Sequence, residues 1–590
     1  MFRSKCLEPH TIAVIPPNGY QPQKKYSIKA LKWLMYLSHK EGVHIQHARN
    51  GGEHRVGKYF LDGFISNPNT DSNTNSNTIN QTQSIAIDFH GCLFHGCPKC
   101  FSPETENPIN KKTMQELYEA TLLRKRFLER EGYTVQELWE CEYEALLKSD
   151  PEMKAYIDSL TIQSPLDPRQ SFFGGRTNAT CLYYEAKAGE KIKYVDFCSL
   201  YPWVNKYREY PLFHPEIITQ DFEDVHNYFG LIKCDVLPPK GLFHGVLPVK
   251  SNNKLMFPLC RKCSETLQQE PCEHTSEERM LKGTWVTLEV QTAIEKGYVV
   301  SNINDVWHYL QKTNSLFSEF IKTFQKLKQE ASGWPASCDT EEKKLQYVED
   351  YFEKEGVRLV FTNVMKNPGL RALAKLMLNS FWGKFGQRLN LTKVAMIKDP
   401  KQLFDLLTND KFEVSDILPI NEEVLEVHYK EQDEFVEASG RTNVVIAAFT
   451  TAHARLKLYS VLEQLEKRVL YFDTDSIIYV SREGEFDPPL GPFLGDLTDE
   501  LDGHHITTFV SGGPKNYAYQ LEDGSSSMKV RGITLNCRST QIVNFETLKH
   551  MVRNFNPLQE GESVQVYEPS KIPNKRLNKD IICKPRITGL

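Results

Sequence analysis

Hydrophobic positions in the N-terminal third of the chain follow helical spacing in two segments and strand-like alternation in four others. The helical segments cover residues 25–40 and 112–132. The strand-like segments, rich in β-branched and aromatic residues, cover residues 43–49, 59–65, 84–91 and 134–142. The order helix, three strands, helix, strand predicts a compact mixed sheet. The polar low-complexity stretch at 66–84 predicts a solvated loop.

Two strand-like runs farther along the chain carry carboxylates. The run at 191–204 contains a strand that ends on Asp196, and the run at 469–480 carries Asp473 and Asp475 at the turn of a predicted hairpin. Two like charges this close repel each other unless a proton or a cation separates them, and a divalent metal ion is the natural occupant. The alternative is an ordinary Asp-rich turn. On adjacent strands, Asp196 and Asp475 could hold two metal ions about 4 Å apart for phosphoryl transfer.

A strongly amphipathic helix is predicted at residues 369–387, ending at Gly383 and Gly386. One face combines cationic, amide and aromatic side chains: Arg371, Lys375, Asn379 and Trp382. The other side is apolar, with Leu373, Met377 and Phe381. We interpret the polar face as a site for a triphosphate, with the Trp ring placed against a base. The alternative is a solvated charge stripe.

Composition limits the class of protein. Of the 590 residues, 40% are hydrophobic and 25% are charged, which is typical of a soluble globular chain with several domains. The net charge of -5 means that nucleic-acid contacts must come from local basic patches. No run of roughly 18 uncharged apolar residues is present, and the first residues lack the apolar core of a signal peptide. We therefore predict an intracellular protein without a membrane partner.

The cysteines include two groups whose spacing is typical of tetrahedral zinc sites. The first group is Cys92, Cys97, Cys100 and Cys141, with the last residue returning from the final strand of the N-terminal sheet. The second group is Cys260, Cys263, Cys272 and His274. The alternative for the second group is a set of free buried thiols. His90 and His95 are spare imidazoles beside the first group, available for catalysis or as alternative ligands.

A second carboxylate site is predicted in the N-terminal sheet. Asp62 lies on the second strand, and Asp88 and His90 lie one pleat apart on the third strand, therefore on the same face. A carboxylate pair with a basic residue on adjoining strands can bind Mg²⁺ and activate water for phosphodiester cleavage. The sequence thus predicts a metal-dependent hydrolytic site in this sheet.

Three segments, DFCSLYP, KLMLNSFWG and YFDTDS, occur in this order and resemble motifs A, B and C of family B DNA polymerases. The segment SGGPKNYAY at 511–519 resembles the Lys-x-Tyr motif that follows them. The segment FFGGRT at 172–177 resembles the aromatic-Gly-Gly motif that precedes them in the protein-primed branch. The closest likeness is to polymerases of self-synthesising DNA transposons, the Polinton or Maverick group. The resemblance implies a metal-dependent DNA polymerase.

The resemblance also implies roles for individual residues. Asp196 and Asp475 would ligate catalytic Mg²⁺ or Mn²⁺ with support from Asp473, and Tyr201 would stack under the incoming sugar and exclude a 2′-hydroxyl. The rest of the nucleotide site would comprise Arg371, Lys375, Asn379 and Trp382. The implied DNA-binding residues are Phe173, Gly174, Gly175, Arg176, Lys515 and Tyr517. Trp382 stands where the family usually has Tyr, which keeps stacking but removes a hydroxyl.

The N-terminal segment resembles very-short-patch-repair and other restriction-endonuclease-like nucleases, through its HGCLFH run, its WEC segment and an upstream Asp. The likeness implies that Asp62 holds Mg²⁺, that His90 and His95 assist, and that the cysteines stabilise the site. Asp88 is a further candidate, although relatives often have Glu in its place. The alternative is a DNA-binding domain with an inactive nuclease fold.

These expectations define an α+β multidomain protein in which a right-hand polymerase of palm, fingers and thumb follows an αβββαβ endonuclease-like domain. The predicted boundaries are 1–161 for the zinc-bearing endonuclease-like domain, 162–212 for the first palm part, 213–300 for an insertion with a zinc site, 301–388 for the fingers, 389–438 for a second insertion, 439–538 for the second palm part and 539–590 for a short thumb.

The predicted function is DNA-directed DNA synthesis, with a DNA template, a primer, dNTPs and a terminal protein primer as expected partners. Residues 1–171 lack the set of acidic motifs typical of a 3′–5′ exonuclease, so no proofreading is expected, and the short thumb indicates a truncated mobile-element copy. DNA nicking is expected as an accessory activity. The alternative is a non-catalytic DNA-binding remnant. The expected location is a host nucleus, a virion or a replication site.

Overall fold

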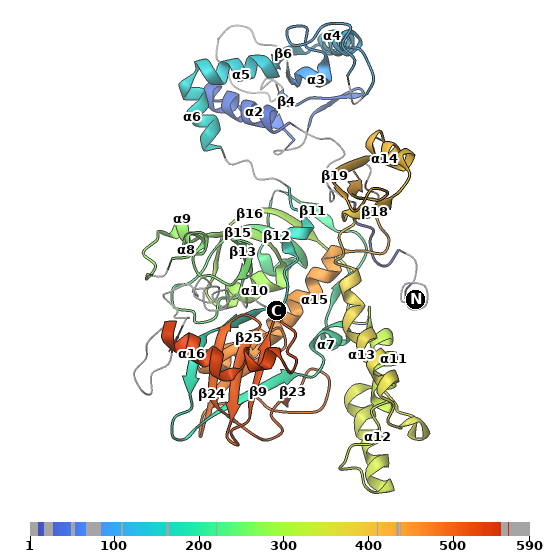
Figure 1. The fold of residues 1–590 in the computed structure, drawn as a ribbon. Helices are drawn as coiled ribbons and strands as arrows, with labels where there is room; N and C mark the ends of the chain where they lie inside the picture. The colour runs from blue at the N-terminus through green and yellow to red at the C-terminus, as the bar shows by residue number, and fades with distance from the viewer. Residues whose placement is uncertain are drawn as a thin grey trace. The chain divides into compact units, whose positions relative to one another are not determined.

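The computed structural model divides the chain into two compact units, residues 21–165 and a larger unit of residues 1–20 and 166–590 (Figure 1). No helix among the described residues is long and apolar enough to cross a membrane. The described residues are 7, 10–16, 20, 27–48, 53–66, 84–107, 110–160, 165–219, 221–268, 270–409, 411–431, 436, 438–555 and 564–565.

The smaller unit combines a four-stranded sheet with helices (Figure 1). The sheet has the order β1 (Gln46–His47), β4 (Gly63–Ile65), β5 (Ile85–His90) and β6 (Thr134–Trp139). Strands β5 and β6 are parallel, and the other pairs are antiparallel. A hairpin joins β2 (Arg55–Val56) to β3 (Tyr59–Phe60). The helices are α2 (Ile28–Glu41), α3 (Cys92–His95), α4 (Met114–Arg130), α5 (Glu140–Ser149) and α6 (Pro151–Ser159).

Local capping signals explain where the two predicted helices of this unit begin. The Ser27 hydroxyl accepts a hydrogen bond from the Ala30 backbone at the start of α2, and Thr113 and Glu116 form a capping box at the start of α4. The predicted last strand is shorter than expected, because it ends at Trp139 and α5 begins at the next residue. Cys141 therefore lies in the first turn of a helix and not on a strand.

The other expected strands of this unit are also shorter or interrupted. Only Gln46–His47 of the run at 43–49 is a strand, and the run at 59–65 is split into β3 and β4 by Leu61 and Asp62. Most of the predicted loop at 66–84 lies outside the described residues.

The larger unit is built on a ten-stranded sheet whose main path runs β26-β25-β24-β9-β22-β21-β7, with β8, β23 and β27 paired at its sides. Its early strands are β7 (Thr177–Ala179), β8 (Cys181–Glu185) and β9 (Glu190–Phe197). Its later strands are β21 (Val469–Asp473), β22 (Ser476–Arg482), β23 (Leu497–Asp499), β24 (Ile506–Gly513), β25 (Asn516–Leu521), β26 (Ser526–Val530) and β27 (Val564–Gln565). The two carboxylate-bearing runs of the sequence thus lie in one sheet.

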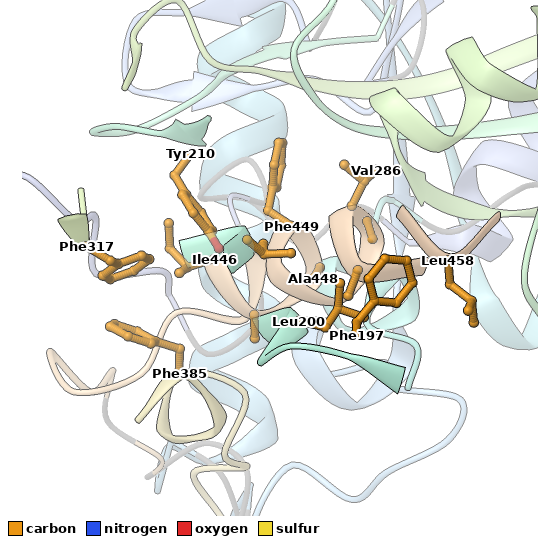
Figure 2. Packing of buried hydrophobic residues seen from close by; sticks show 14 of the residues in the cluster. Phe197, Leu200, Tyr210, Val286, Phe317, Phe385, Ile446, Ala448, Phe449 and Leu458 are labelled. Carbon is orange, nitrogen blue, oxygen red and sulfur yellow. The ribbon is translucent and has the colours of Figure 1, made fainter. Parts of the chain in front are cut away.

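Both faces of this sheet are covered, because successive side chains of its strands point to opposite sides. On one face, Val195 and Phe197 of β9 pack in a cluster with α7 (Leu200–Tyr207) and α15 (Val444–Leu465), part of which Figure 2 shows. On the other face, Ile192 and Tyr194 pack with α16 (Phe545–Phe555). The five consecutive residues 445–449 of α15 are each at most 1% exposed, so this helix is covered on all sides.

A second, antiparallel sheet follows β9 in sequence. Its order is β11 (Glu216–Ile218), β16 (Val299–His308), β12 (Gly230–Leu237) and β15 (Leu281–Val286). A hairpin of β13 (Val249–Ser251) and β14 (Lys254–Met256) and the helices α8 (Arg261–Thr266), α9 (Ser276–Arg279) and α10 (Thr287–Glu295) complete this region. Strands β10 (Tyr210–Pro211) and β17 (Lys312–Thr313) form a separate pair.

Three helices and a small sheet come next in the sequence, before the later strands of the large sheet. The helices are α11 (Ser318–Glu330), α12 (Glu341–Glu355) and α13 (Pro368–Ser380), and α11 packs on α13. The small sheet has the order β18 (Lys393–Ile397), β20 (Leu425–Glu431) and β19 (Phe412–Pro419), with α14 (Pro400–Leu407) against it.

The helix predicted at 369–387 is α13, but it differs from the prediction in two ways. It ends at Ser380, and residues 382–384 form a separate 3₁₀ turn. Its buried side chains are Ala374 and Leu378, whereas Leu373 is exposed. Of the predicted apolar face, Met377 and Phe381 pack against the core cluster as expected, and Leu373 does not.

Candidate functional site

The carboxylates Asp196 and Asp475 lie on neighbouring backbone segments of the large sheet. Asp196 is opposite Ser476 in the antiparallel pair of β9 and β22, and Phe197 N donates a hydrogen bond of 2.7 Å to Asp475 O. The predicted hairpin is confirmed, since β21 and β22 are antiparallel and joined by a tight turn. Thr474 occupies that turn with a φ of 61°, in the left-handed region that lets the chain reverse within two residues.

Burial makes the negative charges of this site costly. Burial, followed by repulsion from Asp475, raises the pKa of Asp196 to about 7. Burial, followed by repulsion from Asp473, raises the pKa of Asp475 to about 6. Glu500 adds a further repulsion at both carboxylates. A site of carboxylate oxygens that resists ionisation in this way fits a hard divalent cation such as Mg²⁺ or Mn²⁺, which would remove the penalty.

Asp473 has protein partners of its own. Its Oδ1 accepts hydrogen bonds from Lys515 Nζ and from Thr177 Oγ1, both at 2.7 Å. Lys515, which is expected at a primer end, pairs with Asp473 in this structure. Asp473 therefore supports the turn beside Asp475.

The aromatic-Gly-Gly segment lies directly behind this turn. Thr474 N donates to Arg176 O at 2.8 Å, and a Cβ on Gly175 would lie 2.8 Å from the Thr474 side chain, so only glycine fits there. Gly174 is exposed and has open space around it.

Two residues of this segment do not have the exposure that DNA contact requires. Phe173 is buried. Arg176 is only 3% exposed, donates through Nη1 to Gly245 O at 2.8 Å and stacks 4.2 Å from the Phe257 ring centroid. The assignment of Arg176 to DNA binding is corrected on this ground, because its guanidinium is used inside the fold.

The expected sugar and base contacts come together. Tyr201 on α7 stacks on Trp382, with ring centroids 4.6 Å apart and an interplanar angle of 29°. The turn into α7 passes through Ser199, which has a φ of 55°. Two aromatic rings from segments 181 positions apart in the sequence thus form one stacked pair beside the strand that carries Asp196.

A third cation, on α11, lies near Arg371 and Lys375 of α13. Lys328 on α11 donates to Ser199 Oγ at 3.1 Å, and its pKa is lowered by burial and by the charges of Arg371 and Lys375. Lys375 also attracts the negative charge of Asp196. Sequence reasoning missed Lys328, because one lysine in a Lys-rich amphipathic helix carries no distinguishing signal. Asn379 is exposed on the same helix as Lys375.

Tyr517 does not have the place expected for a residue at the primer end. It is 3% exposed, and its hydroxyl lies 2.9 Å from that of Tyr194. Lys529 donates to the Tyr194 hydroxyl at 2.9 Å and attracts the negative charge of Asp196. Tyr517 therefore packs in the core, and Lys529 is a cation near the site that the motifs did not reveal.

The nuclease candidates of the smaller unit are gathered around β5. Asp62 accepts a hydrogen bond from Phe89 N at 2.8 Å, and burial raises its pKa to about 6. Asp88 forms a two-pronged ion pair with Arg124, at 2.6 and 2.8 Å. Asp88 is thus neutralised by a protein cation, which argues against the expected role as a metal ligand.

The histidines of this unit have partners that the sequence did not indicate. His90 Nε2 lies 2.9 Å from Glu137 Oε1, and the His90 and His95 rings are 4.8 Å apart. Glu137 is the register partner of Asp88 across the parallel pair of β5 and β6. A single glutamate on a predicted strand carries no local signal that separates it from a solvent-facing residue.

Both predicted ligand groups for zinc converge. The Sγ atoms of Cys92, Cys97, Cys100 and Cys141 all lie within 4.8 Å of one another. The same holds for the ligand atoms of Cys260, Cys263, Cys272 and His274. In the second group, His274 Nδ1 faces all three sulfurs at 3.2 to 3.6 Å. Thiolates and imidazoles at this spacing fit a tetrahedral Zn²⁺ ion.

Comparisons with known proteins place the chain in a family. No curated protein matches it. The ternary complex of phi29 DNA polymerase with primer-template DNA and incoming nucleotides is 17% identical, and the match covers 76% of this chain and 70% of that chain with a TM-score of 0.42. The binary complex of the same enzyme with primer-template DNA is 17% identical, and the match covers 65% of this chain and 56% of that chain with a TM-score of 0.40.

A family model matches residues 143–338 and 345–467, which is more than half of the chain and includes Asp196 and Lys375. The expected polymerase family is thereby confirmed. The protein belongs to the type B DNA polymerases, in the organellar and viral family.

Proposed function

We propose that the larger unit is a DNA-directed DNA polymerase that adds dNTPs to a primer end. The observation that carries the proposal is the position of Asp196 and Asp475 on adjacent backbone segments, where burial and repulsion from neighbouring carboxylates raise both pKa values. Mg²⁺ or Mn²⁺ bound there would stabilise the charge that develops on the attacking and leaving oxygens. Lys515 pairs with Asp473, so Asp196 and Asp475 are the two carboxylates proposed to bind the cations.

The nucleotide site in this proposal is formed by α7, α11 and α13. Lys328, Arg371 and Lys375 carry like charges that act on one another, and such a group suits a triphosphate. Tyr201, braced by Trp382, lies at the entrance to α7 and would exclude a 2′-hydroxyl by contact. Asn379 follows Lys375 by one turn of α13 and would contact the nascent pair.

The finer assignments belong to the same proposal. The large sheet with α15 and α16 would be the palm, and α11 to α13 the fingers, of a right-hand polymerase. Protein priming, an origin in a Polinton-like mobile element and the absence of proofreading are supported by the sequence resemblance alone. A non-catalytic DNA-binding remnant is the alternative.

Primer extension by the full chain decides between these two functions. In Mg²⁺, the wild type should extend a primed template, and Asp196→Asn or Asp475→Asn should reduce the rate by at least about 100-fold, since charge stabilisation in the transition state is lost. Asp502→Asn, at an exposed position of the same unit, is the matched control. Wild-type protein that binds the primed template but does not extend it would establish the remnant.

A second function, DNA nicking, is proposed for the smaller unit. It is favoured by Asp62, whose carboxylate is buried beside Asp88, and by the adjoining His90 and His95 rings. Since Asp88 is paired with Arg124, Asp62 would carry the metal ion. In this role Asp88 acts through Arg124 and does not touch the metal.

Nicking can be tested separately from polymerisation. The full chain with Asp475→Asn should convert supercoiled plasmid to the nicked form in Mg²⁺ or Mn²⁺, and adding Asp62→Asn should stop the reaction. Asp158→Asn, at an exposed position of α6, should leave nicking unchanged. Plasmid that is bound but left intact with both metals would overturn the nicking function.

A further inference from the structure

Three cations from separate parts of the sequence gather beside the aromatic-Gly-Gly segment. Arg169 lies in the 3₁₀ turn of residues 168–171 that leads into this segment. Lys250 lies in β13, within the predicted zinc-bearing insertion. Arg388 follows the segment that carries motif B. We refer to Arg169, Lys250 and Arg388 as the 169/250/388 cluster.

Backbone carbonyls hold the members of this cluster in place. Arg169 donates from Nη1 to Gly386 O at 3.0 Å and from Nη2 to Gln387 O at 3.4 Å, the two residues that precede Arg388. A Cβ on Gly386 would lie 2.7 Å from the Phe172 ring, so this glycine lets the two segments touch. The arrangement is therefore fixed by the fold.

The side chain of Lys250 also points to the aromatic-Gly-Gly segment. Its Nζ donates to Phe172 O at 3.2 Å and lies 5.3 Å from the centroid of the Phe173 ring. The hairpin that carries Lys250 is attached to α8 by the Ser251 hydroxyl, which donates to Ser264 O at 3.0 Å. The insertion thus delivers a positive charge to the aromatic-Gly-Gly segment.

The cluster has an excess of positive charge. Within the described parts of the chain, none of its three members has a carboxylate within 4.0 Å. Asp167 attracts Arg169 and Lys250, but its Oδ1 already accepts the Arg169 backbone N–H at 2.9 Å. Burial and then Arg388 lower the pKa of Arg169, and burial, Arg388 and Arg169 lower that of Lys250. Cations that repel one another in a fixed arrangement indicate an anionic ligand.

The surroundings identify the chemistry of that ligand. Gly174 is exposed, a Cβ there would meet nothing within 4 Å, and its carbonyl is held by Arg455 Nη1 at 2.9 Å. A chain of regularly spaced anions could approach this open backbone closely. Arg176, the cation that the sequence motif itself supplies, is buried and cannot serve such a ligand.

We propose that the 169/250/388 cluster binds backbone phosphates of the nucleic-acid strand that passes the aromatic-Gly-Gly segment. The proposal rests on the polymerase function and names the residues that hold the strand behind the catalytic turn. The template as a single strand is the favoured source of these phosphates, and the duplex product offers the same chemistry.

The salt dependence of DNA binding tests the proposal without requiring catalysis. Binding of the full chain to fluorescent single-stranded and primed-template DNA is measured by anisotropy at several KCl concentrations, without dNTPs. Each phosphate contact contributes roughly 0.7 to the slope of log K against log salt for a single strand and roughly 0.9 for a duplex. Lys250→Gln and Arg388→Gln should each lower the slope by about that amount, and Lys240→Gln, an exposed control in the same insertion, should not.

The measurements on single-stranded and on duplex DNA distinguish the two possible sources of the phosphates. A loss confined to single-stranded DNA assigns the cluster to the template, and a loss confined to the duplex assigns it to the product. Arg169→Lys, which keeps the charge, should retain the slope that Arg169→Gln loses. Unchanged slopes for Lys250→Gln and Arg388→Gln on both DNAs would overturn the proposal. Wild-type protein that binds DNA with the expected slope but does not extend primers would overturn the polymerase function alone.

Discussion

Lys206 Nζ lies 2.7 Å from Glu355 Oε2, and neither side chain is more than 3% exposed. The pair joins α7, which carries Tyr201, to the end of α12. Glu355 Oε1 also accepts a hydrogen bond from Leu494 N at 2.7 Å, in the loop whose Asp496 carbonyl accepts from Cys198 N. One buried carboxylate therefore ties the end of α12 to α7, which follows Asp196 in the sequence, and to the loop that is hydrogen-bonded to Cys198.

Breaking this pair should destabilise the larger unit. Lys206→Met leaves Glu355 as a buried charge without its cation, and we expect a loss of about 3–5 kcal/mol in the free energy of unfolding, measured with urea by tryptophan fluorescence. The double variant Lys206→Met/Glu355→Gln should recover part of the loss. Lys322→Met, which breaks an exposed pair with Glu319, should change stability by less than about 1 kcal/mol. Equal effects of the buried and exposed variants would contradict the role of the pair.

Tyr201→Val should allow ribonucleotides to be incorporated, because the ring that meets the 2′ position would be absent. The measurement is the ratio of kcat/KM for dNTP and rNTP in single-nucleotide primer extension. Tyr201→Phe keeps the ring and its stacking on Trp382, so it should retain the wild-type ratio. If Tyr201→Val discriminates as well as the wild type, another residue selects the sugar.

Elemental analysis of the purified chain should find about two Zn²⁺ ions, one in each convergent cysteine group. Cys97→Ser should lose one ion and Cys263→Ser the other, because serine is a poor zinc ligand. Cys537→Ser, at an exposed cysteine outside both groups, should keep both ions. A folded, metal-free wild type would refute both sites.

His244 should make the larger unit sensitive to acid. It is buried, and burial followed by the nearby charge of Arg176 lowers its pKa to about 3. Since the unfolded chain binds the proton near pH 6.5 and the folded chain does not, folding loses stability as pH falls from that value towards 3. Between pH 7.5 and 5.5 this group should cost about 1.4 kcal/mol. The difference in unfolding free energy between wild type and His244→Gln should shrink by that amount, and a constant difference would show that His244 does not titrate in this way.

The sequence alone identified the carboxylates of the turn between β21 and β22, the order of the motifs and both cysteine groups. These features are local or have regular spacing, and the chemistry of carboxylates and thiols is visible in the residue types themselves. The hairpin of β21 and β22 followed from alternation around Asp473 and Asp475, and the family match confirms the polymerase family.

Only the tertiary structure decided which of these side chains are available for function. Arg176 and Tyr517 belong to motifs, yet packing buries them, while Lys328 and the 169/250/388 cluster carry no local signal and are assembled from distant segments. The pairing of Asp88 with Arg124 was equally hidden. The spacing of residues along the chain shows which groups are near one another in sequence. Burial and charge pairing depend on contacts between different elements, and the pattern of hydrophobic and polar residues within one element does not contain that information.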